Sequence, residues 1–292
     1  MPAASRSLGV CVTVLSIQSH VAVGHAGNAA AVFSIERMGL EVWPVFTTLL
    51  SRHKAHPHWR GYTPEAAQLE EIIAGIEASG ALSRCRAVLV GYLAHIDQVR
   101  VVAATLGKVR GASRDALFLL DPVLGEKATG LYVEPGIAEA VRERLVPTAD
   151  IVTPNAFELE YLSGVKAASL EDALRAADRL RVRGPSVVIC SSCPGAGEHE
   201  IATLAVTEDG AWRVLTPRLA SRVFGTGDLL AAIFLAHYLN HGSIEGALGH
   251  AVSAVYGVLQ ATLARAGDEL ALIAAQDEIV APSALFAPER LR

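Results

Sequence analysis

The sequence is poor in cysteine, in aromatic residues and in charge of one sign. Its 292 residues include four cysteines, 5% aromatic residues and a formal net charge of −5. Four cysteines in a chain of this length are too few for a disulfide scaffold, which favours a reducing compartment. Because the chain has no basic stripe and no run of like charge, we expect neither nucleic acid nor a membrane surface as a partner.

Long apolar runs are also missing, although 51% of the residues are hydrophobic. No run looks long enough to cross a bilayer. The first one, Val10–Ile17, spans eight residues, lacks a convincing cleavage site and is followed by polar residues. We therefore predict a buried strand there, no signal peptide, and a cytoplasmic protein. The high apolar content supplies a sizeable core and argues against disorder.

Short apolar runs alternate with longer amphipathic ones along the chain. Continuous apolar runs are typical of a parallel sheet that helices cover on both faces. The expected strands are 10–17, 42–46, 87–90, 117–120, 151–153, 187–190, 201–206 and 212–215, the last two forming a hairpin. The expected helices are 28–38, 64–78, 98–109, 136–144, 156–162, 170–181, 229–239 and 244–266. Right-handed crossovers give a doubly wound α/β layer, and we predict a single domain over residues 1–292.

A glycine-flanked turn precedes the apolar helix expected at 229–239. It consists of Gly225–Gly227 followed by Asp228. Glycines let backbone N–H groups approach an anion, and the N-terminus of a helix adds positive potential. Asp228 would lie beside that anion and could accept a proton from an attacking hydroxyl. An ordinary loop with an N-capping Asp fits the same residues, so the turn alone does not decide the function.

Polar residues follow several of the other expected strands. In open parallel sheets ligands bind beyond the carboxyl ends of the strands, so we expect these residues on one rim. They are Ser16, Gln18, Ser19, His20, Tyr92, Asp121, Thr153, Asn155, Glu158, Ser191 and Ser192.

These segments together resemble the pyridoxal kinases of the ribokinase-like superfamily. The matching segments are Ser16–His20, Gly24–Asn28, Gly91-Tyr92, Asp121–Gly125, Asp150–Asn155, Phe157-Glu158 and Gly225–Asp228, within a resemblance that runs from about residue 12 to 266. The glycine turn marks the superfamily, whereas the first three segments are specific to the pyridoxal kinase branch. The resemblance implies a three-layer α/β/α sandwich with a central, mostly parallel sheet. It also implies ATP-dependent phosphorylation of the 5′-hydroxyl of pyridoxal, a Mg²⁺ ion and usually a homodimer. K⁺ is a further candidate cofactor.

The resemblance also implies roles for individual residues. Asp228 corresponds to the catalytic base, and Gly225, Thr226 and Gly227 correspond to the anion hole for the transferring phosphoryl group. Asp121 and Glu158 correspond to acidic residues that hold Mg²⁺ mostly through water, which suits an ion that keeps several waters. The other implied nucleotide-site positions are Thr153, Asn155, Ser191, Arg218, Leu219 and Ala220. The implied substrate positions are Ser19, Val23, His53, Lys54 and Tyr92.

Three positions depart from the family pattern. Lys54 stands where many relatives have Thr, in a loop that covers the substrate in the family. It could contact an anionic ring oxygen or a phosphate, or face solvent. Val23 replaces an aromatic residue of some relatives, and Ser191 lacks the nearby lysine of several bacterial relatives. The departures leave the use of ATP intact and the preferred form of vitamin B6 open.

Two other groups of residues have simpler explanations. Cys190 and Cys193 have the spacing of redox and zinc sites, but no second pair accompanies them. We predict a core Cys190 and an incidental Cys193. His53, His56 and His58 are interpreted as loop histidines and not as metal ligands.

Other functions remain in view. A hydroxymethylpyrimidine or sugar kinase of the same superfamily is the nearest rival, and a catalytically silent vitamin B6-binding protein is the rival from another class. A dinucleotide-dependent oxidoreductase is disfavoured, because no G-x-G-x-x-G motif follows the first strand.

Overall fold

The computed structural model describes residues 12–221 and 223–292. The first two residues of the strand predicted at 10–17 lie outside this part of the chain. The main strands are β1 (Thr13–Val21), β2 (Glu41–Leu50), β3 (Gly61–Tyr62), β4 (Cys85–Val90), β5 (Leu117–Leu120), β8 (Ile151–Val152), β9 (Val187–Cys193), β10 (Glu200–Val206), β11 (Ala211–Pro217) and β12 (Glu289–Arg290). A separate hairpin consists of β6 (Gly125–Glu126) and β7 (Gly130–Leu131).

Within the described residues, ten strands form one sheet in the order β12-β11-β10-β9-β8-β5-β4-β1-β2-β3. The strands from β2 to β9 in this order pair in parallel. Antiparallel pairing is confined to the two sides, where β3 pairs with β2 and where β9, β10, β11 and β12 follow one another. The predicted hairpin is confirmed as β10 and β11.

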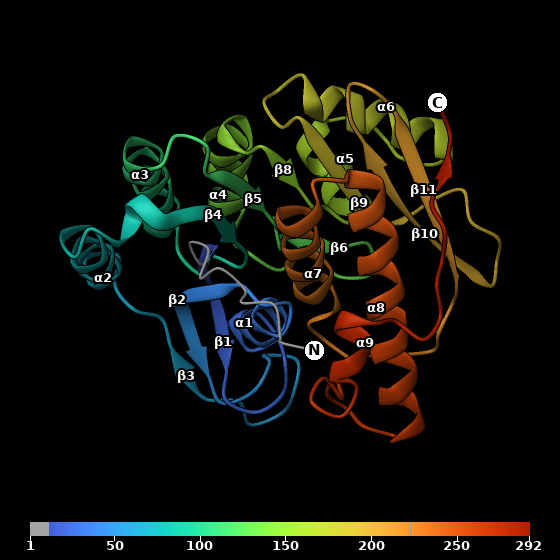
Figure 1. The fold of residues 1–292 in the computed structure, drawn as a ribbon, viewed down its shortest axis with the longest axis horizontal. Coiled ribbons are helices and arrows are strands. Elements are labelled where there is room, and N and C mark those ends of the chain that lie inside the picture. The colour runs from blue at the N-terminus through green and yellow to red at the C-terminus, as the bar shows by residue number, and fades with distance from the viewer. Residues whose placement is uncertain (1–11, 222) are drawn as a thin grey trace, which may run out of the picture.

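Helices lie on both faces of this sheet (Figure 1). They are α1 (Asn28–Arg37), α2 (Ala66–Ala78), α3 (Ile96–Ala112), α4 (Pro135–Ala140), α5 (Ala156–Ser163), α6 (Leu170–Arg181), α7 (Thr226–His241), α8 (Ile244–Ala264) and α9 (Gln276–Val280). Short helical turns are η1 (Ala81–Arg84), η2 (Val141–Leu145) and η3 (Val146–Thr148). The predicted α/β class with a central, mostly parallel sheet is confirmed.

The two faces of the sheet bury two separate apolar cores. Side chains of α2 to α6 pack on one face, and side chains of α1, α7, α8 and α9 pack on the other. In β1 the alternation follows the pleat, because Leu15 and Ile17 face the first core and Val14 faces the second. The strand is therefore apolar on both sides, which explains the continuous apolar runs in the sequence.

The prediction that no run of residues is long enough to cross a bilayer is wrong by length and composition. Helix α8 has 21 residues and contains an 18-residue window with a mean hydropathy of 1.3, so by length and composition it could cross a bilayer. Half of its most apolar window is buried within the fold, where α8 packs beside α7. The core helix of a water-soluble protein meets the same criterion, so the helix is weak evidence for a membrane span.

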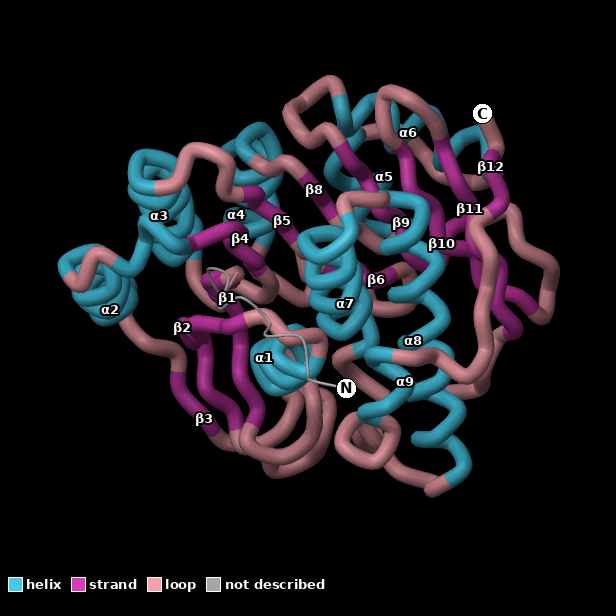
Figure 2. The backbone as a smooth tube through the Cα atoms, in the orientation of Figure 1, coloured by secondary structure: helices cyan, strands magenta, loops and turns pink. Residues whose placement is uncertain are grey.

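The loops that continue from β1 and β2 lie side by side next to α1 (Figure 2). Backbone hydrogen bonds join them, from Ala22 N–H to the Leu50 carbonyl at 2.8 Å and from Val23 N–H to the Ser51 carbonyl at 2.9 Å. This pairing brings the residues after Ser19 close to the loop that carries His53 and Lys54.

Candidate active site

The glycine turn forms the start of α7 as predicted. Gly225 is the N-cap residue and adopts a left-handed conformation with a φ of 92°. A side chain at this position would overlap the carbonyl oxygen of His25, so only glycine fits. Asp228 lies in the first turn and does not cap its own helix. The simpler interpretation of Asp228 as an N-cap is therefore wrong.

Asp228 is held by a backbone group far away in the sequence. Its Oδ2 accepts a hydrogen bond from the N–H of Gly27 at 2.8 Å. Gly27 itself packs so closely on Ser19 that a side chain there would overlap the Ser19 carbonyl oxygen. The contacts therefore join Ser19, Gly27 and Asp228 in one continuous series at the carboxyl end of β1.

Three carboxyl groups gather at this rim. Asp121 follows β5, is 6% exposed and lies next to the glycine turn, since a Cβ on Gly227 would be 3.8 Å from its Oδ2. Burial raises the pKa of Asp121 well above its usual range, and the charges of Glu158 and Asp228 raise it further, against a smaller effect of the Thr153 hydroxyl. Burial also raises the pKa of Asp228, and the Gly27 N–H opposes that shift. The cluster thus concentrates negative charge where a cation would relieve it.

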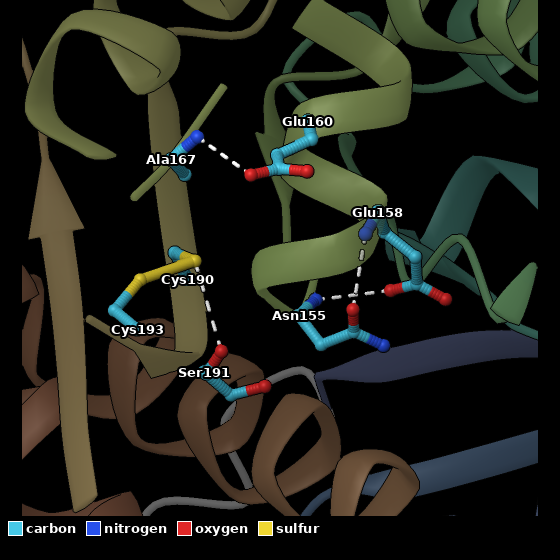
Figure 3. Close-up of a disulfide and its surroundings, with 7 residues drawn as sticks. All are labelled: Asn155, Glu158, Glu160, Ala167, Cys190, Ser191 and Cys193. Carbon is cyan, nitrogen blue, oxygen red and sulfur yellow. Dashed lines mark hydrogen bonds between the residues drawn. A yellow bond between two sulfur atoms is a disulfide. The ribbon is translucent and has the colours of Figure 1, made fainter. Parts of the chain in front are cut away.

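Glu158 uses both carboxylate oxygens to fix the neighbouring loops. Its Oε1 accepts hydrogen bonds from the N–H groups of Leu124 and Gly125 at 2.7 and 3.3 Å, and its Oε2 accepts one from Asn155 N–H at 3.0 Å. The Asn155 side chain accepts a bond from Glu158 N–H in return, which closes a capping box at the start of α5 (Figure 3). Burial raises the pKa of Glu158 to about 7, although the three N–H groups lower it.

These contacts decide how the cluster could hold a divalent cation. Asp121 has a buried carboxylate next to the glycine turn, and its raised pKa reflects burial first and two neighbouring carboxylates second. Glu158 already accepts three backbone hydrogen bonds, so it suits contact through water better than direct coordination. Among the described residues no three His, Cys, Asp or Glu side chains stand close enough to bind a metal by themselves. The cluster fits an ion that keeps most of its waters.

A cavity of about 150 Å³ adjoins the glycine turn and could hold a nucleotide. Four predicted nucleotide-site residues line it: Ser191, Leu219, Thr226 and Gly227. Its opposite wall is the side of α8 with Val252, Val255, Tyr256 and Leu259. This wall is not predictable from the sequence, because apolar residues at helical spacing fit core packing equally well.

The other predicted nucleotide-site residues lie outside the cavity lining. Asn155 and Thr153 follow β8, and Pro154 between them accepts a hydrogen bond from Ser191 N–H at 3.0 Å. Arg218 donates to the Glu200 carbonyl at 3.0 Å and does not line the cavity, and neither does Ala220.

Cys190 and Cys193 form a disulfide at the end of β9 (Figure 3). The prediction that Cys193 is incidental is therefore wrong. The disulfide encloses Ser191 and Ser192, which both line the cavity. Ser192 adopts a left-handed conformation with a φ of 52°, and the pairing of β9 with β10 is irregular at this point. The sequence spacing alone could not reveal this pairing, because it also fits unpaired cysteines.

Residues of the predicted substrate loop converge near Tyr92. Lys54 Nζ donates to the Tyr92 hydroxyl at 3.2 Å and lies 5.3 and 5.6 Å from the ring centroids of Tyr92 and Trp59. The ring of His53 stacks on Phe224, directly before the glycine turn. Burial lowers the pKa of His53 to about 4, with contributions from His56 and Lys54. His53 is therefore neutral at physiological pH.

One residue at the site was not predicted, and one predicted residue is largely exposed. Tyr132 is 50% exposed, but partial desolvation of its hydroxyl raises its pKa, and the carboxylates of Glu158, Asp121 and Asp228 raise it further. Sequence reasoning missed this residue because it follows the short β6–β7 hairpin. The Val23 side chain, predicted at the ring site, is 52% exposed.

Two histidines, His20 and His25, lie at and after the end of β1. His25 Nδ1 lies 2.9 Å from the Leu270 carbonyl oxygen. His20 packs against the Phe46 ring, with the centroids 4.7 Å apart. Both contacts fit packing of the glycine-rich loop.

Comparisons with known proteins agree with this geometry. Residues 23–270 match the family model described as phosphomethylpyrimidine kinase. The curated pyridoxal kinase PdxY of Rubrobacter xylanophilus is 46% identical over 98% of this chain and 99% of its own length. The one of Deinococcus radiodurans is 43% identical over 95% of this chain and 96% of its own. The structure of pyridoxal kinase from Leishmania donovani in complex with ADP and pyridoxamine superimposes with a TM-score of 0.90, at 31% identity over 96% of this chain and 99% of that one.

Proposed function

The chain belongs to the pyridoxal kinases of the ribokinase-like superfamily, and from this premise we propose that it phosphorylates the 5′-hydroxyl of pyridoxal with ATP, in vitamin B6 salvage. Pyridoxine and pyridoxamine are further candidate substrates. The observation that carries the proposal is the position of Asp228. The Gly27 amide holds its carboxylate at the start of α7, between Ser19 on one side and the cavity at Thr226 and Gly227 on the other.

Asp228 is proposed as the general base. The substrate hydroxyl would be oriented towards the transferring phosphoryl group, and the Asp228 carboxylate would take its proton as the new bond to phosphorus forms. The raised pKa of Asp228 makes its carboxylate a better proton acceptor than an ordinary aspartate. The hydrogen bond from Gly27 orients the carboxylate while leaving Oδ1 available.

The glycine turn is proposed to stabilise the transferring group. The first N–H groups of α7 have no partner within the helix, so those of Gly225–Gly227 can donate to phosphoryl oxygens. Because these donors are fixed before the reaction, they need little reorganisation as charge develops. Ser191 and Leu219, with the apolar wall of α8, would enclose the remainder of the nucleotide. Thr153, Asn155, Arg218 and Ala220 would act from outside the cavity.

Asp121 and Glu158 are proposed to hold Mg²⁺. Asp121 would face the ion across the glycine turn, and Glu158 would act through water while it fixes the loop after Asp121. When bound, Mg²⁺ would neutralise charge on the β- and γ-phosphates. Binding of the ion would also favour the ionised form of Asp121, whose pKa is raised without it.

The ring site is proposed to consist of Ser19, Val23, His53, Lys54 and Tyr92. Ser19 would hydrogen-bond the pyridine ring, and Tyr92 would provide an apolar contact beside it. Two proposals come from the resemblance, a homodimer and K⁺ as a candidate cofactor. Two others come from the sequence pattern, a cytoplasmic location and a single domain over residues 1–292. One sheet that joins strands from β1 to β12 supports the single domain.

An assay of ADP formation tests the proposal against its rivals. The substrates are pyridoxal, pyridoxine, pyridoxamine, hydroxymethylpyrimidine and ribose, each with Mg²⁺ and ATP. We expect turnover with pyridoxal. The match to the phosphomethylpyrimidine kinase model makes hydroxymethylpyrimidine the second candidate. Turnover with that compound alone would contradict the proposal. Binding of pyridoxal without any turnover would favour a silent binding protein.

A further inference from the structure

The substrate loop, defined as residues 51–60, is joined to the glycine turn by a stack of two rings. The His53 imidazole lies nearly parallel to the Phe224 ring, with centroids 3.9 Å apart and planes 13° apart. His56 adds an edge contact to the same ring at 6.0 Å. Phe224 directly precedes Gly225, so this contact connects the loop that carries Lys54 with the N-terminus of α7.

The substrate loop is also held by hydrogen bonds between its two ends and by ion pairs with the segment after α8. Its two ends are joined by hydrogen bonds from Ser51 N–H to the Arg60 carbonyl at 2.6 Å and from Arg60 N–H to Ser51 Oγ at 2.8 Å. On one side Arg52 forms ion pairs with Asp268 and Glu269 at 2.9 and 3.0 Å. These contacts fix the loop to the segment after α8, whereas the ring stack is its contact with the turn that would bind phosphate.

We propose that Phe224 is a positioning residue that couples closure of the substrate loop over the vitamin to the alignment of the glycine turn on the transferring phosphoryl group. The inference rests on the proposed kinase function. A closed substrate loop excludes water from the phosphoryl group. Because the His53–Phe224 stack joins the loop to the glycine turn, closure of the loop and alignment of the turn would occur together. Phosphate would then pass to the bound hydroxyl in preference to water.

Removal of the ring has two expected consequences. Stacked rings contribute about 0.5–1.5 kcal/mol beyond their buried area, so kcat/KM for pyridoxal should fall by about 2- to 10-fold. The KM for ATP should change little, because Phe224 does not line the cavity. The transferring group should also become accessible to water, so that ATP is hydrolysed without phosphorylation of pyridoxal.

The test measures ADP and pyridoxal phosphate in the same reaction. We expect equal amounts from the wild-type protein and an excess of ADP from Phe224→Leu. Phe224→Tyr keeps the stack and should restore equal amounts. The matched control is Phe33→Leu, which shortens another half-buried phenylalanine in the core between α1 and the sheet. Equal amounts from Phe224→Leu, or the same excess from Phe33→Leu, would overturn the inference.

A double-mutant cycle and a fluorescence measurement test the stack independently. His53→Leu should also cause an excess of ADP, and the effect of the double variant should be smaller than the two single effects combined, because each single change already removes the His53–Phe224 contact. Additive effects would overturn the inference. Trp59 lies in the same loop, so its fluorescence can report closure of the loop without turnover. The measurement uses a background that carries Trp43→Phe and Trp212→Phe, which leaves Trp59 as the remaining tryptophan.

With a non-hydrolysable ATP analogue, pyridoxal should change the Trp59 fluorescence of the wild-type protein more than that of Phe224→Leu. Equal fluorescence changes in the two proteins would overturn the inference. Absence of phosphorylation of every form of vitamin B6 is a different result, and it would contradict the proposed function.

Discussion

At the scale of single residues, the structure separates groups that the sequence placed together. Asp121, Glu158 and Asp228 were all predicted as acidic residues of one site, and Glu158 and Asp228 do lie close enough to raise the pKa of Asp121. Their partners differ, however. Glu158 accepts three backbone N–H groups and Asp228 accepts one from a loop 201 residues away. Residue types and spacing predicted the cluster, but hydrogen bonds between distant loops could not be predicted from them.

Asp228 gives the sharpest prediction at this scale. We expect Asp228→Asn to lower kcat by about 10²–10⁴-fold, the usual effect of losing a general base, with little change in KM for ATP. Steady-state kinetics with pyridoxal measures both. The control is Asp97→Asn, which makes the same change in the first turn of α3. A kcat near that of the wild type would remove Asp228 from the mechanism.

The sequence leaves two main interpretations of Lys54, a contact with the substrate or exposure to solvent. The hydrogen bond from Lys54 to Tyr92 favours a position at the ring site. A cation there would stabilise the ionised phenolic oxygen of the pyridine ring. We expect Lys54→Thr to shift the ratio of kcat/KM between pyridoxal and pyridoxine by several-fold, corresponding to about 1 kcal/mol. Competition kinetics gives the ratio directly. Lys166→Thr, a change at another exposed loop lysine, should leave it unchanged. An unchanged ratio would mean that Lys54 does not contact the pyridine ring of the substrate and faces solvent.

At the scale of elements, the long periodic segments were predictable, whereas four of the five two-residue strands among the described residues were not; β8 was predicted, at 151–153. Helix α6 begins and ends where expected, because Ser169 accepts a hydrogen bond from Asp172 N–H at its N-terminus and an apolar stripe sets its length. The two-residue strands β3, β6, β7 and β12 were missed. A strand of two residues has no detectable alternation, and it forms because the neighbouring chain is already in place.

The disulfide at the end of β9 is an element that can be tested by its chemistry. Without reductant, peptide mapping of the denatured, alkylated protein should find Cys190 and Cys193 joined. In the chain-entropy model, closing so short a loop stabilises the fold by about 2 kcal/mol. Cys193→Ser should therefore lower the free energy of unfolding by about that amount without reductant.

Dithiothreitol serves as the control for that measurement. It would reduce the protein disulfide to two thiols and would itself be oxidised to a cyclic disulfide. The difference in free energy of unfolding between the wild-type protein and Cys193→Ser should then largely disappear. A difference that persists with the reductant would come from packing at Cys193. In a reducing compartment the thiol form is expected to prevail.

At the scale of the whole molecule, one rim of the sheet collects every part of the proposed site. The carboxyl ends of β1, β4, β5, β8 and β9 supply Ser19, Tyr92, Asp121, Asn155 and Ser191. This placement followed from the sequence, because a parallel doubly wound sheet brings strand ends together. The cavity wall on α8 and the contact of the substrate loop with Phe224 depend on how distant segments pack, and no local pattern predicts that.

The cluster of carboxyl groups also gives the molecule a predictable response to pH. The pKa of Glu158 is raised from 4.5 to about 7, and those of Asp121 and Asp228 are raised as well. Between those two pH values the folded protein binds more protons at Glu158 than the unfolded chain does, so the contribution of Glu158 to stability falls as the pH rises. The raised pKa values of Asp121 and Asp228 act in the same direction. The half-buried His53 and His237 have lowered pKa values of about 4 and act in the opposite direction. The metal-free protein should therefore show only a weak net dependence on pH between 4.5 and 7.

Mg²⁺ separates the two contributions, because the ion and protons compete for the carboxyl groups while the histidines are unaffected. We expect Mg²⁺ to raise Tm clearly at pH 7.5 and little at pH 5, since each displaced proton weakens the apparent affinity by about tenfold per pH unit in that window. Thermal unfolding with and without the ion measures this, and calorimetry in buffers of different ionisation enthalpy counts the protons released. Asp121→Asn removes the carboxylate that faces the glycine turn and should abolish most of the effect at pH 7.5. An equal rise in Tm at both pH values, or one that survives in Asp121→Asn, would place the ion away from this cluster.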